Sequence, residues 1–406
     1  MSKAWLDVVG IGEDGMDGLS PAARALVETA EVIIGGDRHH QLSANVNAER
    51  VAWPSPFDAM IDTMKSFRGR RLVVLVTGDP LWFSVGARML RSIPAEEIRF
   101  HPQLSAFQWA SCRLGWSLPD IELLTIHGRP AEQFLPHVAP GVKMILLTKD
   151  ATSPVAVARL LSERGYGESR LVVLGALGGP RETRQDGIAR QWCENAPEFP
   201  AFHVLAIELV AGSGAQVLPR TGLADSAFEH DGKMTKQTVR AVTLAKLIPV
   251  RDGVLWDIGS GCGSVAIEWM RAAPEARAIG IEPRADRRAV SARNALALGV
   301  PALKLVDGEA PGALAGLPAP DAVFIGGGLS DAVFDSAYAA LKPLGRLVAN
   351  AVTLESEAVL LELFARHGGE LVRIATQSAD PVGPYHGWRA AMPVTQWSIT
   401  KRGAGA

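Results

Sequence analysis

Cysteine is scarce in this chain of 406 residues, which has only Cys112, Cys193 and Cys262. Three scattered cysteines are too few for a disulfide framework or for a zinc site built from thiolates. Aromatic residues make up 6% of the sequence, and no apolar run approaches the 18 residues of a membrane helix. The N-terminus also lacks the apolar core of a signal peptide. We therefore expect a soluble, cytoplasmic protein that binds no metal.

An excess of either charge is also missing, because 41 Lys and Arg residues stand against 43 Asp and Glu residues. Neither half of the chain has the basic surplus that is typical of proteins that bind nucleic acids, so we do not expect DNA or RNA as the main ligand. With 48% hydrophobic and 21% charged residues, the composition is that of a folded enzyme. The length predicts two or three domains.

What the sequence does contain is a repeated order of short aliphatic runs, most of them ending at glycines and followed by an Ala- and Leu-rich stretch. These runs occupy residues 6–12, 71–79, 143–148 and 170–179 in the first half, and 254–261, 276–282, 321–328 and 345–350 in the second. Continuous apolar strands that alternate with helices indicate parallel sheets covered on both faces. The expected fold class is α/β.

A stretch rich in Gly, Ser and Pro predicts a domain boundary near the middle of the chain. Residues 211–232 show no helical period, and such a composition is typical of linkers. A long surface loop inside one domain is the alternative. We expect two domains, 1–211 and 229–406, joined by a linker at 212–228. The two domains are not a repeat, because their glycine loops differ in spacing.

The glycine loop of the second half follows the predicted strand 254–258 and reads Gly-Ser-Gly-Cys-Gly from Gly259 to Gly263. Glycines let the backbone pass close to a ligand, and the helix start offers unpaired N–H groups. The loop lacks the G-x-G-x-x-G spacing that accompanies a dinucleotide pyrophosphate, since position 264 is Ser. S-adenosylmethionine (SAM) has no phosphate, so the spacing favours SAM over NAD.

Acidic residues stand where three successive strands of this half end. The carboxylate of Glu282 follows the strand 277–281, where it can accept both hydroxyls of a ribose. The pair Asp307-Gly308 follows the next strand, where an adenine edge would be held. Asp257, at the end of the first strand, would order the loop or face the ammonium group of SAM. The predicted SAM-binding residues of this half are Asp257, Gly259, Ser260, Gly261, Gly263, Glu282, Asp307 and Gly308.

The second half resembles the decarboxylating methyltransferases of corrin biosynthesis. The resemblance spans about residues 229–400 and is carried by MTKQTVRA (234–241), DIGSGCGSVAIEW (257–269), GEAP (308–311), PDAVFIGGG (320–328) and NAVTLE (350–355). It implies a Rossmann-like, class I SAM-methyltransferase fold with an antiparallel finish near 396–400. Met392 stands where that family usually has Asn, so no role is transferred to this position.

The first half is similar to the tetrapyrrole (precorrin) methylases. The stretches 8–36, LVTGDPLWFSVG (75–86) and PQLSAFQWA (102–110) agree with that family in order and spacing, and Glu13-Asp14 is typical of its precorrin-6 branch. The resemblance implies a two-lobed α/β domain, a class III SAM methyltransferase, with SAM between the lobes. The SAM-binding residues it implies are Gly78, Asp79, Pro80, Ser105, Ala106, Thr148 and Ala176.

A chain with both halves resembles the two-domain precorrin methyltransferases. The resemblance implies methylation of carbon 5 by the first domain. It also implies methylation of carbon 15 and release of the ring C acetate as carbon dioxide by the second, with one SAM per domain. A cobalt-bearing macrocycle, another small molecule or RNA is an alternative substrate, and a nucleotide-sensing scaffold or an NAD-binding module is an alternative of another class. Because both families tend to self-associate, we expect a homo-oligomer.

The implied tetrapyrrole carries many carboxylates, so each pocket should offer basic side chains. One pair of candidates lies four residues apart on a predicted helix face. A second pair lies in the segment 381–394, which is predicted to be a loop that covers the pocket. A turn arginine is the candidate in the first domain, with a purely solvated side chain as the equal alternative. The predicted substrate-binding residues are Lys236, Arg240, His386, Arg389 and Arg38. No residue is assigned as catalytic.

Overall fold

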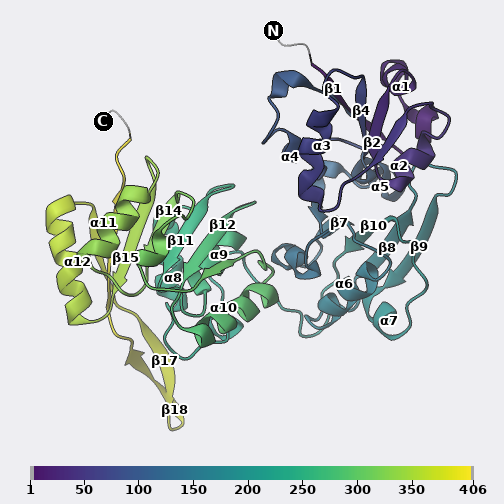
Figure 1. The fold of residues 1–406 in the computed structure, drawn as a ribbon. Coiled ribbons are helices and arrows are strands. Elements are labelled where there is room, and N and C mark those ends of the chain that lie inside the picture. Colours follow the sequence, from purple (N-terminus) through teal and green to yellow (C-terminus); the bar gives the residue numbers. More distant parts are fainter. Residues whose placement is uncertain (1–3, 404–406) are drawn as a thin grey trace. The chain divides into compact units, whose positions relative to one another are not determined.

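The computed structural model describes residues 4–403, and the chain forms two compact units (Figure 1). Unit 1 comprises Met1–Ala131 and Ala139–Gln216, and unit 2 comprises Glu132–Val138 and Val217–Ala406. Both units are layered α/β structures, which confirms the predicted fold class. No helix within the described residues is both long and apolar enough to cross a membrane.

The first lobe of unit 1 is a five-stranded, wholly parallel sheet. Its strands, in spatial order, are β3 (Glu49–Ala52), β2 (Val32–Gly35), β4 (Leu72–Thr77), β1 (Leu6–Ile11) and β5 (Ile98–His101). The helices are α1 (Pro21–Glu28), α2 (Asp37–Leu42), α3 (Met60–Ser66), α4 (Gly86–Met89) and α5 (Ala106–Leu114). Alternate residues of β1 enter two cores: Val8 packs with α3 and α4, and Val9 packs with α1. The Ser20 side chain caps α1 by accepting from the backbone N–H of Ala23.

The second lobe of unit 1 is a mixed sheet. Its strands, in spatial order, are β6 (Glu122–Thr125), β7 (Lys143–Leu147), β10 (His203–Glu208), β8 (Arg170–Gly175) and β9 (Thr183–Ile188). Helices α6 (Ser153–Ser162) and α7 (Ala189–Glu194) complete the lobe. Strand β10 runs antiparallel to both neighbours, so β7 and β8 end at the same sheet edge, on either side of the start of β10.

Unit 2 is a seven-stranded sheet between two layers of helices. Its strands, in spatial order, are β13 (Lys304–Val306), β12 (Arg277–Ile281), β11 (Val254–Ile258), β14 (Ala322–Ile325), β15 (Arg346–Ala351), β19 (Val394–Thr400) and β16 (Glu370–Ile374). The helices are α8 (Gln237–Leu247), α9 (Ser264–Ala272), α10 (Ala285–Ala297), α11 (Asp331–Ala340) and α12 (Leu354–His367). Strand β11 sends Trp256 into the core under α11 and α12 and Leu255 into the core under α8 and α9. The antiparallel β19 is the finish that the resemblance implied.

The second part of the predicted linker is packed structure. Leu223 is fully buried and Phe228 is 5% exposed, and both belong to a core cluster of unit 2 with Ile267 of α9. The backbone N–H groups of Gly222 and Leu223 donate to a carboxylate of α9. The sequence offered no helical or strand period here, because these residues are held by separate apolar anchors rather than by a regular element.

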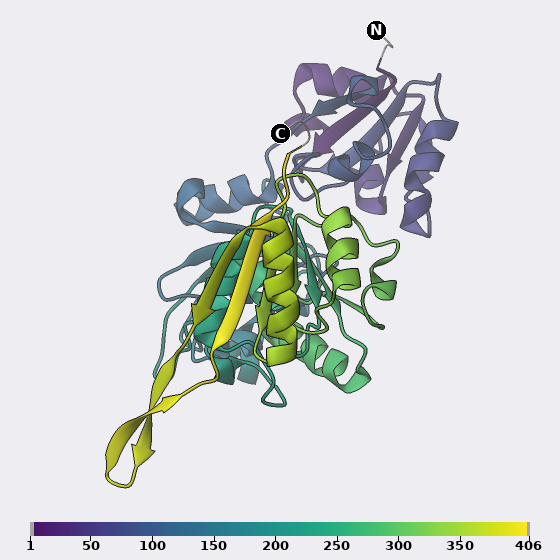
Figure 2. The ribbon, with the colours of Figure 1, turned by 90° about the vertical axis from the view of Figure 1, so that its left-hand side faces the viewer.

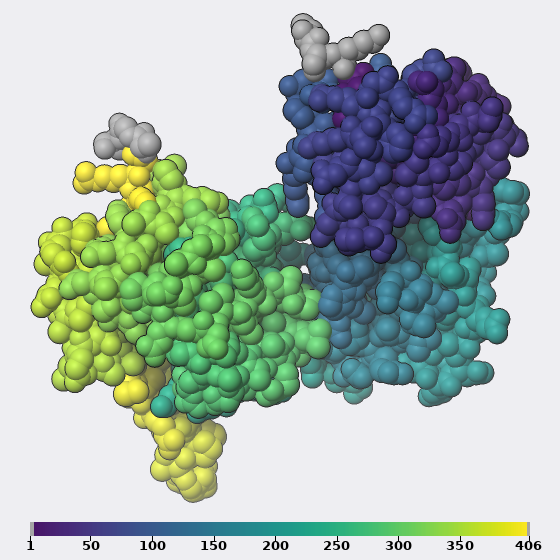
Figure 3. Space-filling view, viewed as in Figure 1, coloured from purple at the N-terminus to yellow at the C-terminus, as the bar shows by residue number. Residues whose placement is uncertain are grey.

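The segment 381–394 was predicted to be a loop over the pocket, and the prediction of a loop is wrong for most of the segment. Most of it belongs to a β-hairpin of β17 (Gln377–Val382) and β18 (Tyr385–Ala390). The hairpin projects from the rest of unit 2, as the yellow strands in Figure 2 and the yellow extension in Figure 3 show. Tyr385 and Trp388 are each 76% exposed. Regular backbone pairing between the two strands explains why residues 381–390 are extended, whereas Ala391, Met392 and Val394 line the cavity described below.

Candidate active sites

The carboxyl edge of the unit 2 sheet borders a cavity of about 940 Å³. Its walls are the glycine loop after β11, the ends of β12 and β14, the segment 232–236 before α8, and residues at the base of the hairpin. Seven of the residues predicted for this domain line it: Asp257, Gly259, Ser260, Gly261, Glu282, Gly308 and Lys236. The cavity therefore collects residues from the ends of five strands, β11 to β15, which is where open α/β sheets bind ligands.

The three glycines of this loop have different surroundings, so each is required for a different reason. A Cβ at Gly259 would lie 2.9 Å from the backbone nitrogen of Gly327, so this position needs glycine for close packing of two loops. At Gly261, which has φ +55°, a Cβ would meet only the Lys233 carbonyl oxygen, at 3.9 Å. Gly263 does not line the cavity; a Cβ there would lie 2.2 Å from Ser291 Oγ of α10. Only Gly261 therefore leaves open space beside the backbone, and Gly263 serves helix packing.

Glu282 is buried at the cavity wall and holds the glycine loop. Its Oε2 accepts from the Gly261 N–H at 3.0 Å, and its Oε1 accepts from the Arg284 N–H at 3.1 Å. The side chain is 3% exposed. Asp307, in contrast, lies outside the cavity lining, and its carboxylate binds the Arg288 guanidinium at 2.7 Å. The structure thus brings Glu282, but not the side chain of Asp307, to the wall.

Asp257 is a buried carboxylate with one unsatisfied oxygen. Its Oδ2 accepts from the Ala266 N–H at 3.0 Å, whereas Oδ1 has no partner among residues 4–403. Burial raises the pKa of Asp257 to about 7, and the nearby charge of Glu282 adds to the rise, against the Ala266 hydrogen bond. The buried Ser260 hydroxyl likewise lacks a partner in the described part of the chain. Unpaired buried polar atoms are costly, and both of these belong to residues that line the cavity.

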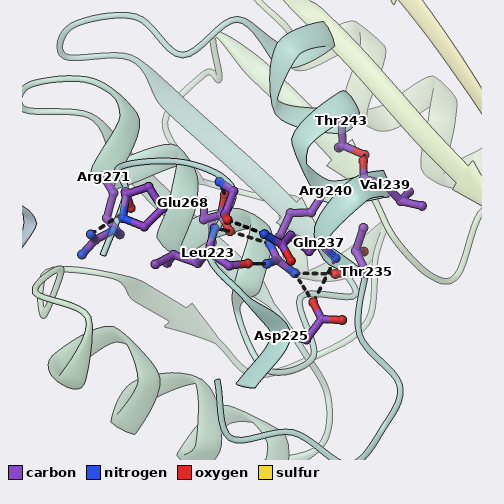
Figure 4. Close-up of polar contacts among 12 residues, drawn as sticks. Leu223, Asp225, Thr235, Gln237, Val239, Arg240, Thr243, Glu268 and Arg271 are labelled. Carbon is purple, nitrogen blue, oxygen red and sulfur yellow. Dashed lines mark hydrogen bonds and ion pairs between the residues drawn. The ribbon is translucent and has the colours of Figure 1, made fainter. Parts of the chain in front are cut away.

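Arg240 does not face the cavity, and its prediction as a substrate-binding residue is wrong (Figure 4). The side chain is fully buried. Its Nε donates to Glu268 at 2.6 Å, and its two Nη atoms donate to Asp225 and to backbone carbonyls. Helix α8 begins after Lys236, at Gln237, so the assumption that Lys236 and Arg240 share a helix face fails.

The buried ion pair of Arg240 with Glu268 fixes one wall of the cavity. Glu268 also accepts from the N–H groups of Gly222 at 2.6 Å and Leu223 at 3.0 Å. Arg240 Nη1 donates to the Thr235 carbonyl at 2.6 Å, and Thr235 itself lines the cavity. The pair thus ties the segment before α8 to α8 and α9. Its charges have their polar partners inside the protein, as a buried ion pair requires.

The other three basic residues predicted for unit 2 lie in two different places. Lys236 lines the cavity with its side chain 52% exposed and its Nζ 3.8 Å from Asp225. His386 and Arg389 lie on the hairpin and are not part of the lining, and Arg389 Nε is 3.0 Å from Asp380 of the paired strand. Of the four basic residues predicted here, only Lys236 reaches the cavity.

A polar trio that sequence reasoning missed stands behind the cavity wall. Asn350 lines the cavity, and its Nδ2 donates to Thr243 Oγ1 at 3.1 Å. Gln396 Nε2 lies 2.9 Å from both Asn350 Oδ1 and Thr243 Oγ1. The amide of Asn350 is therefore held in one orientation. Its motif, NAVTLE, was noticed in the sequence, but the two partners come from distant elements and share no local pattern with it.

In unit 1 the residues implied by the resemblance gather from two helix–sheet lobes. Gly78 follows β4 with φ +62°, and a Cβ there would lie 2.9 Å from Ser105 Cα, so the turn after β4 touches the start of α5. The Ser105 hydroxyl is buried and has no partner within the described residues. Asp79 Oδ1 accepts from the Leu81 N–H at 2.8 Å, which closes the turn that continues through Pro80. Ala106 is the first residue of α5.

The other two positions lie at the facing edge of the second lobe. Thr148 follows β7, and its hydroxyl donates to the His203 carbonyl at 2.7 Å. Ala176 follows β8 with φ +45°, a backbone conformation that costs a non-glycine residue energy and is concentrated at functional sites. Arg38 of the first lobe stacks over the ring of Phe202, 4.2 Å from its centroid, next to the start of β10. The two sheet edges are thus neighbours.

Within residues 4–403 no group of three or more His, Cys, Asp or Glu side chains is arranged to hold a metal ion. Cys262, in the glycine loop, is buried.

Comparison with known proteins gives matches for both units. Residues 6–190 match the Tetrapyrrole (Corrin/Porphyrin) Methylases and residues 226–401 the Precorrin methyltransferase domain. The sequence is 48% identical to a precorrin-6Y C(5,15)-methyltransferase (decarboxylating) of a Sinorhizobium species, over 98% of this chain and 96% of that protein. It is 38% identical to the protein of the same name from Mycobacterium tuberculosis, over 97% and 99%. The crystal structure of the C-terminal domain of precorrin-6Y C5,15-methyltransferase from Rhodobacter capsulatus has a TM-score of 0.43 and 51% identity, covering 45% of this chain and 100% of that one.

Proposed function

This chain belongs to the family of decarboxylating precorrin-6Y C(5,15)-methyltransferases, and from that premise we propose its substrate, its products and the task of each unit. The substrate is precorrin-6B (precorrin-6Y), which receives methyl groups from SAM at carbons 5 and 15. The acetate side chain of ring C leaves as carbon dioxide, and the product is precorrin-8X. Identity over nearly the whole length of two relatives is the observation that carries this proposal.

We place one SAM in the cavity of unit 2. Glu282 would accept the ribose hydroxyls, because its carboxylate is buried at the wall beside the open backbone of Gly261. The unpaired Oδ1 of Asp257 would accept from the ammonium group, and the Ser260 hydroxyl would gain a polar partner. SAM supplies a methyl group that is already activated by its sulfonium.

We place the second SAM in unit 1, at the turn Gly78-Asp79-Pro80 and the residues that face it. The buried hydroxyl of Ser105 and the strained backbone of Ala176 support this position, because both are features of a ligand site on opposite lobes. Thr148 would contribute its backbone, since its hydroxyl is already bonded to His203.

The protein's part in the chemistry is mainly alignment. Holding the two reactants in a reactive geometry supplies roughly 7–11 kcal/mol of barrier reduction. Lys236 is positioned to bind a substrate carboxylate at the mouth of the unit 2 cavity, and Asn350 presents a fixed amide to the same space. The protonated macrocycle can accept the electron pair released by decarboxylation, so no further electron sink is needed from the chain.

We assign methylation of carbon 5 to unit 1, and methylation of carbon 15 with decarboxylation to unit 2. This division follows the sequence-based domains 1–211 and 229–406, extended so that residues 217–228 belong to unit 2, where Leu223 and Phe228 are buried.

The test is mass spectrometry of the full chain with precorrin-6B and methyl-labelled SAM. We expect two labelled methyl groups and the loss of one carboxyl group, and calorimetry should give two SAM per chain. A Glu282→Ala variant should retain one of the two SAM sites. A product with two methyls but all its carboxyls would contradict the proposal, as would turnover of only the cobalt-bearing macrocycle. Stabilisation by NAD instead of SAM in a thermal-shift assay would contradict the cofactor.

A further inference from the structure

The last residue of β4, Thr77, stands immediately before the proposed SAM turn of unit 1, and its side chain is exposed. Two side chains of helix α2, which follows the neighbouring strand β2, reach its hydroxyl oxygen. Arg38 Nη2 lies 2.5 Å from Thr77 Oγ1, and His39 Nε2 lies 3.1 Å from the same atom. The roles of these three groups can be settled from their other contacts.

His39 acts as a donor in this contact. Its Nδ1 accepts from the Gly36 N–H at 3.1 Å, so Nδ1 carries no proton. Burial, together with the nearby charge of Arg38, lowers the pKa of His39 to about 4, so the ring is neutral near pH 7. A neutral imidazole has one proton, which must therefore be on Nε2, directed at Thr77.

Arg38 can only donate, because a guanidinium has no acceptor. It is held in place from two other sides. It forms an ion pair with Glu13, whose side chain is only 7% exposed, and it stacks over Phe202 at 4.2 Å. Its contact with Thr77 is therefore part of a fixed arrangement rather than one rotamer of a free surface arginine.

A threonine hydroxyl has two lone pairs and one proton. Arg38 and His39 occupy both lone pairs of Thr77, so its proton is left to donate to solvent or to a ligand. Within the described residues no acceptor for this proton is found, and the side chain is exposed at the sheet edge. Donation from a guanidinium also polarises the hydroxyl and strengthens it as a donor, above all toward an anion.

We propose that the hydroxyl of Thr77 binds a carboxylate oxygen of a ligand in the unit 1 site. The inference rests on the proposed function of unit 1 and adds a ligand contact to it. The charge of Glu13 does not oppose an anion here, because Arg38 neutralises it and Arg181 Nη2 lies 3.9 Å away. An ammonium group cannot be the ligand, since it has no acceptor for the proton. The carboxylate belongs either to a tetrapyrrole side chain or to the methionine part of SAM.

The experiment compares Thr77→Val, which keeps the shape but removes the hydroxyl, with Thr77→Ser, which keeps the hydroxyl. Thr183→Val, at an exposed position of β9 in the same unit, is the matched control. Calorimetry of the full chain gives the SAM affinity at both sites, and mass spectrometry gives KM and kcat for the carbon 5 methyl. For Thr77→Val we expect a loss of about ten- to a hundredfold, the range for a hydrogen bond to a charged group.

A raised KM for the tetrapyrrole with unchanged SAM affinity identifies the substrate carboxylate. Weaker binding of SAM at one of the two sites identifies the cofactor carboxylate. Wild-type values for Thr77→Val in both measurements overturn the inference, and so does a Thr77→Ser variant as impaired as Thr77→Val. If the wild-type chain adds no methyl at carbon 5, the proposed function of unit 1 fails instead. Calorimetry with SAM and with the tetrapyrrole then decides the inference: weaker binding of either ligand in Thr77→Val supports it, and unchanged binding of both overturns it.

Discussion

The two sites that we propose for the methyl donor, one in each unit, differ in the kinds of side chain that they gather. Unit 2 uses one sheet, and its cavity wall carries two buried carboxylates, Asp257 and Glu282. Unit 1 uses two sheets whose edges meet, and the chemistry gathered there is mostly donors: a guanidinium, an imidazole N–H and hydroxyls. If both units bind SAM as proposed, they do so with different electrostatic surroundings.

The two proposed sites also differ in the contacts that hold their walls in place. In unit 2 the wall before α8 depends on a fully buried ion pair, Arg240 with Glu268. In unit 1 the corresponding support is backbone packing, because the turn at Gly78 lies directly against Ser105. Substitutions should therefore damage the two sites independently, and the following experiments test that independence.

The largest effect is expected for Arg240→Ala. The variant leaves Glu268 buried without its cationic partner, which costs about 3–5 kcal/mol of the stability of unit 2. Unit 1 should be unaffected, so thermal unfolding should show one transition at a lower temperature and one unchanged. Arg277→Ala is the control, because its pair with Asp252 is exposed and contributes at most about 1 kcal/mol. If Arg240→Ala and Arg277→Ala lost the same amount of stability, the pair of Arg240 with Glu268 would not be a special support of unit 2.

Gly78→Val should abolish methylation of carbon 5 and spare decarboxylation. At φ +62° the backbone strain of a branched residue costs about 1–3 kcal/mol, and the clash with Ser105 adds about 1–3 kcal/mol. The product should carry one new methyl and lack one carboxyl when analysed by mass spectrometry. Gly128→Val is the control, since that glycine also has positive φ but no atom within 4 Å of its Cβ position. A product with two new methyl groups from Gly78→Val would contradict the assignment of carbon 5 methylation to unit 1.

Glu282→Ala should weaken SAM binding in unit 2 alone. The loss of a buried acceptor for ligand hydroxyls and for the Gly261 N–H costs about 1–3 kcal/mol, or ten- to a hundredfold in affinity. Calorimetry should resolve one unchanged and one weakened site. Asp307→Ala is the matched control, because its side chain lies outside the cavity lining and should leave both affinities unchanged. Normal binding at both sites in Glu282→Ala would show that Glu282 is not the ribose anchor.

The smallest effect is a pH dependence confined to unit 2. Because the pKa of Asp257 is raised to about 7, the folded unit keeps a proton that the unfolded chain releases above about pH 4. This contribution to stability therefore falls as pH rises from about 4 to 7 and is constant above. A cationic ligand prefers the ionised form, so SAM affinity in unit 2 should rise up to about tenfold per pH unit toward pH 7.

Calorimetry between pH 5.5 and 7.5 measures this dependence. In Asp257→Asn, the SAM affinity of unit 2 should no longer rise with pH. The pH dependence of SAM affinity in unit 1 should be the same in this variant and in the wild type. A slope that persists in Asp257→Asn would mean that another group controls it.

Sequence reasoning found what the backbone path determines. Strand ends such as Glu282 and Gly261 could be placed because a buried aliphatic run fixes where its own carboxyl end must lie. The start of α1 was predictable for a similar local reason, since Ser20 and Pro21 are adjacent in sequence. These features need no knowledge of distant partners.

What escaped prediction depends on partners far along the chain. The fate of Arg240 is decided by Glu268, 28 residues later, and no local pattern distinguishes it from a substrate-binding arginine. The hydroxyl of Thr77 contacts His39, which lies 38 residues earlier in helix α2, so no local pattern predicts this contact. The segment 381–394 was predicted to be a loop because the strands that it contributes to have no buried face and therefore no apolar period in the sequence.

The hairpin has a practical consequence for optical work. Trp388 is 76% exposed, whereas Trp256, Trp269 and Trp397 are at most 1% exposed, and no other tryptophan in the described part of the chain is as open to solvent. Iodide added to the solution will therefore quench the fluorescence of the hairpin before that of the cores. The red-shifted, quenchable share of the emission is a label-free signal for whatever covers or moves this hairpin.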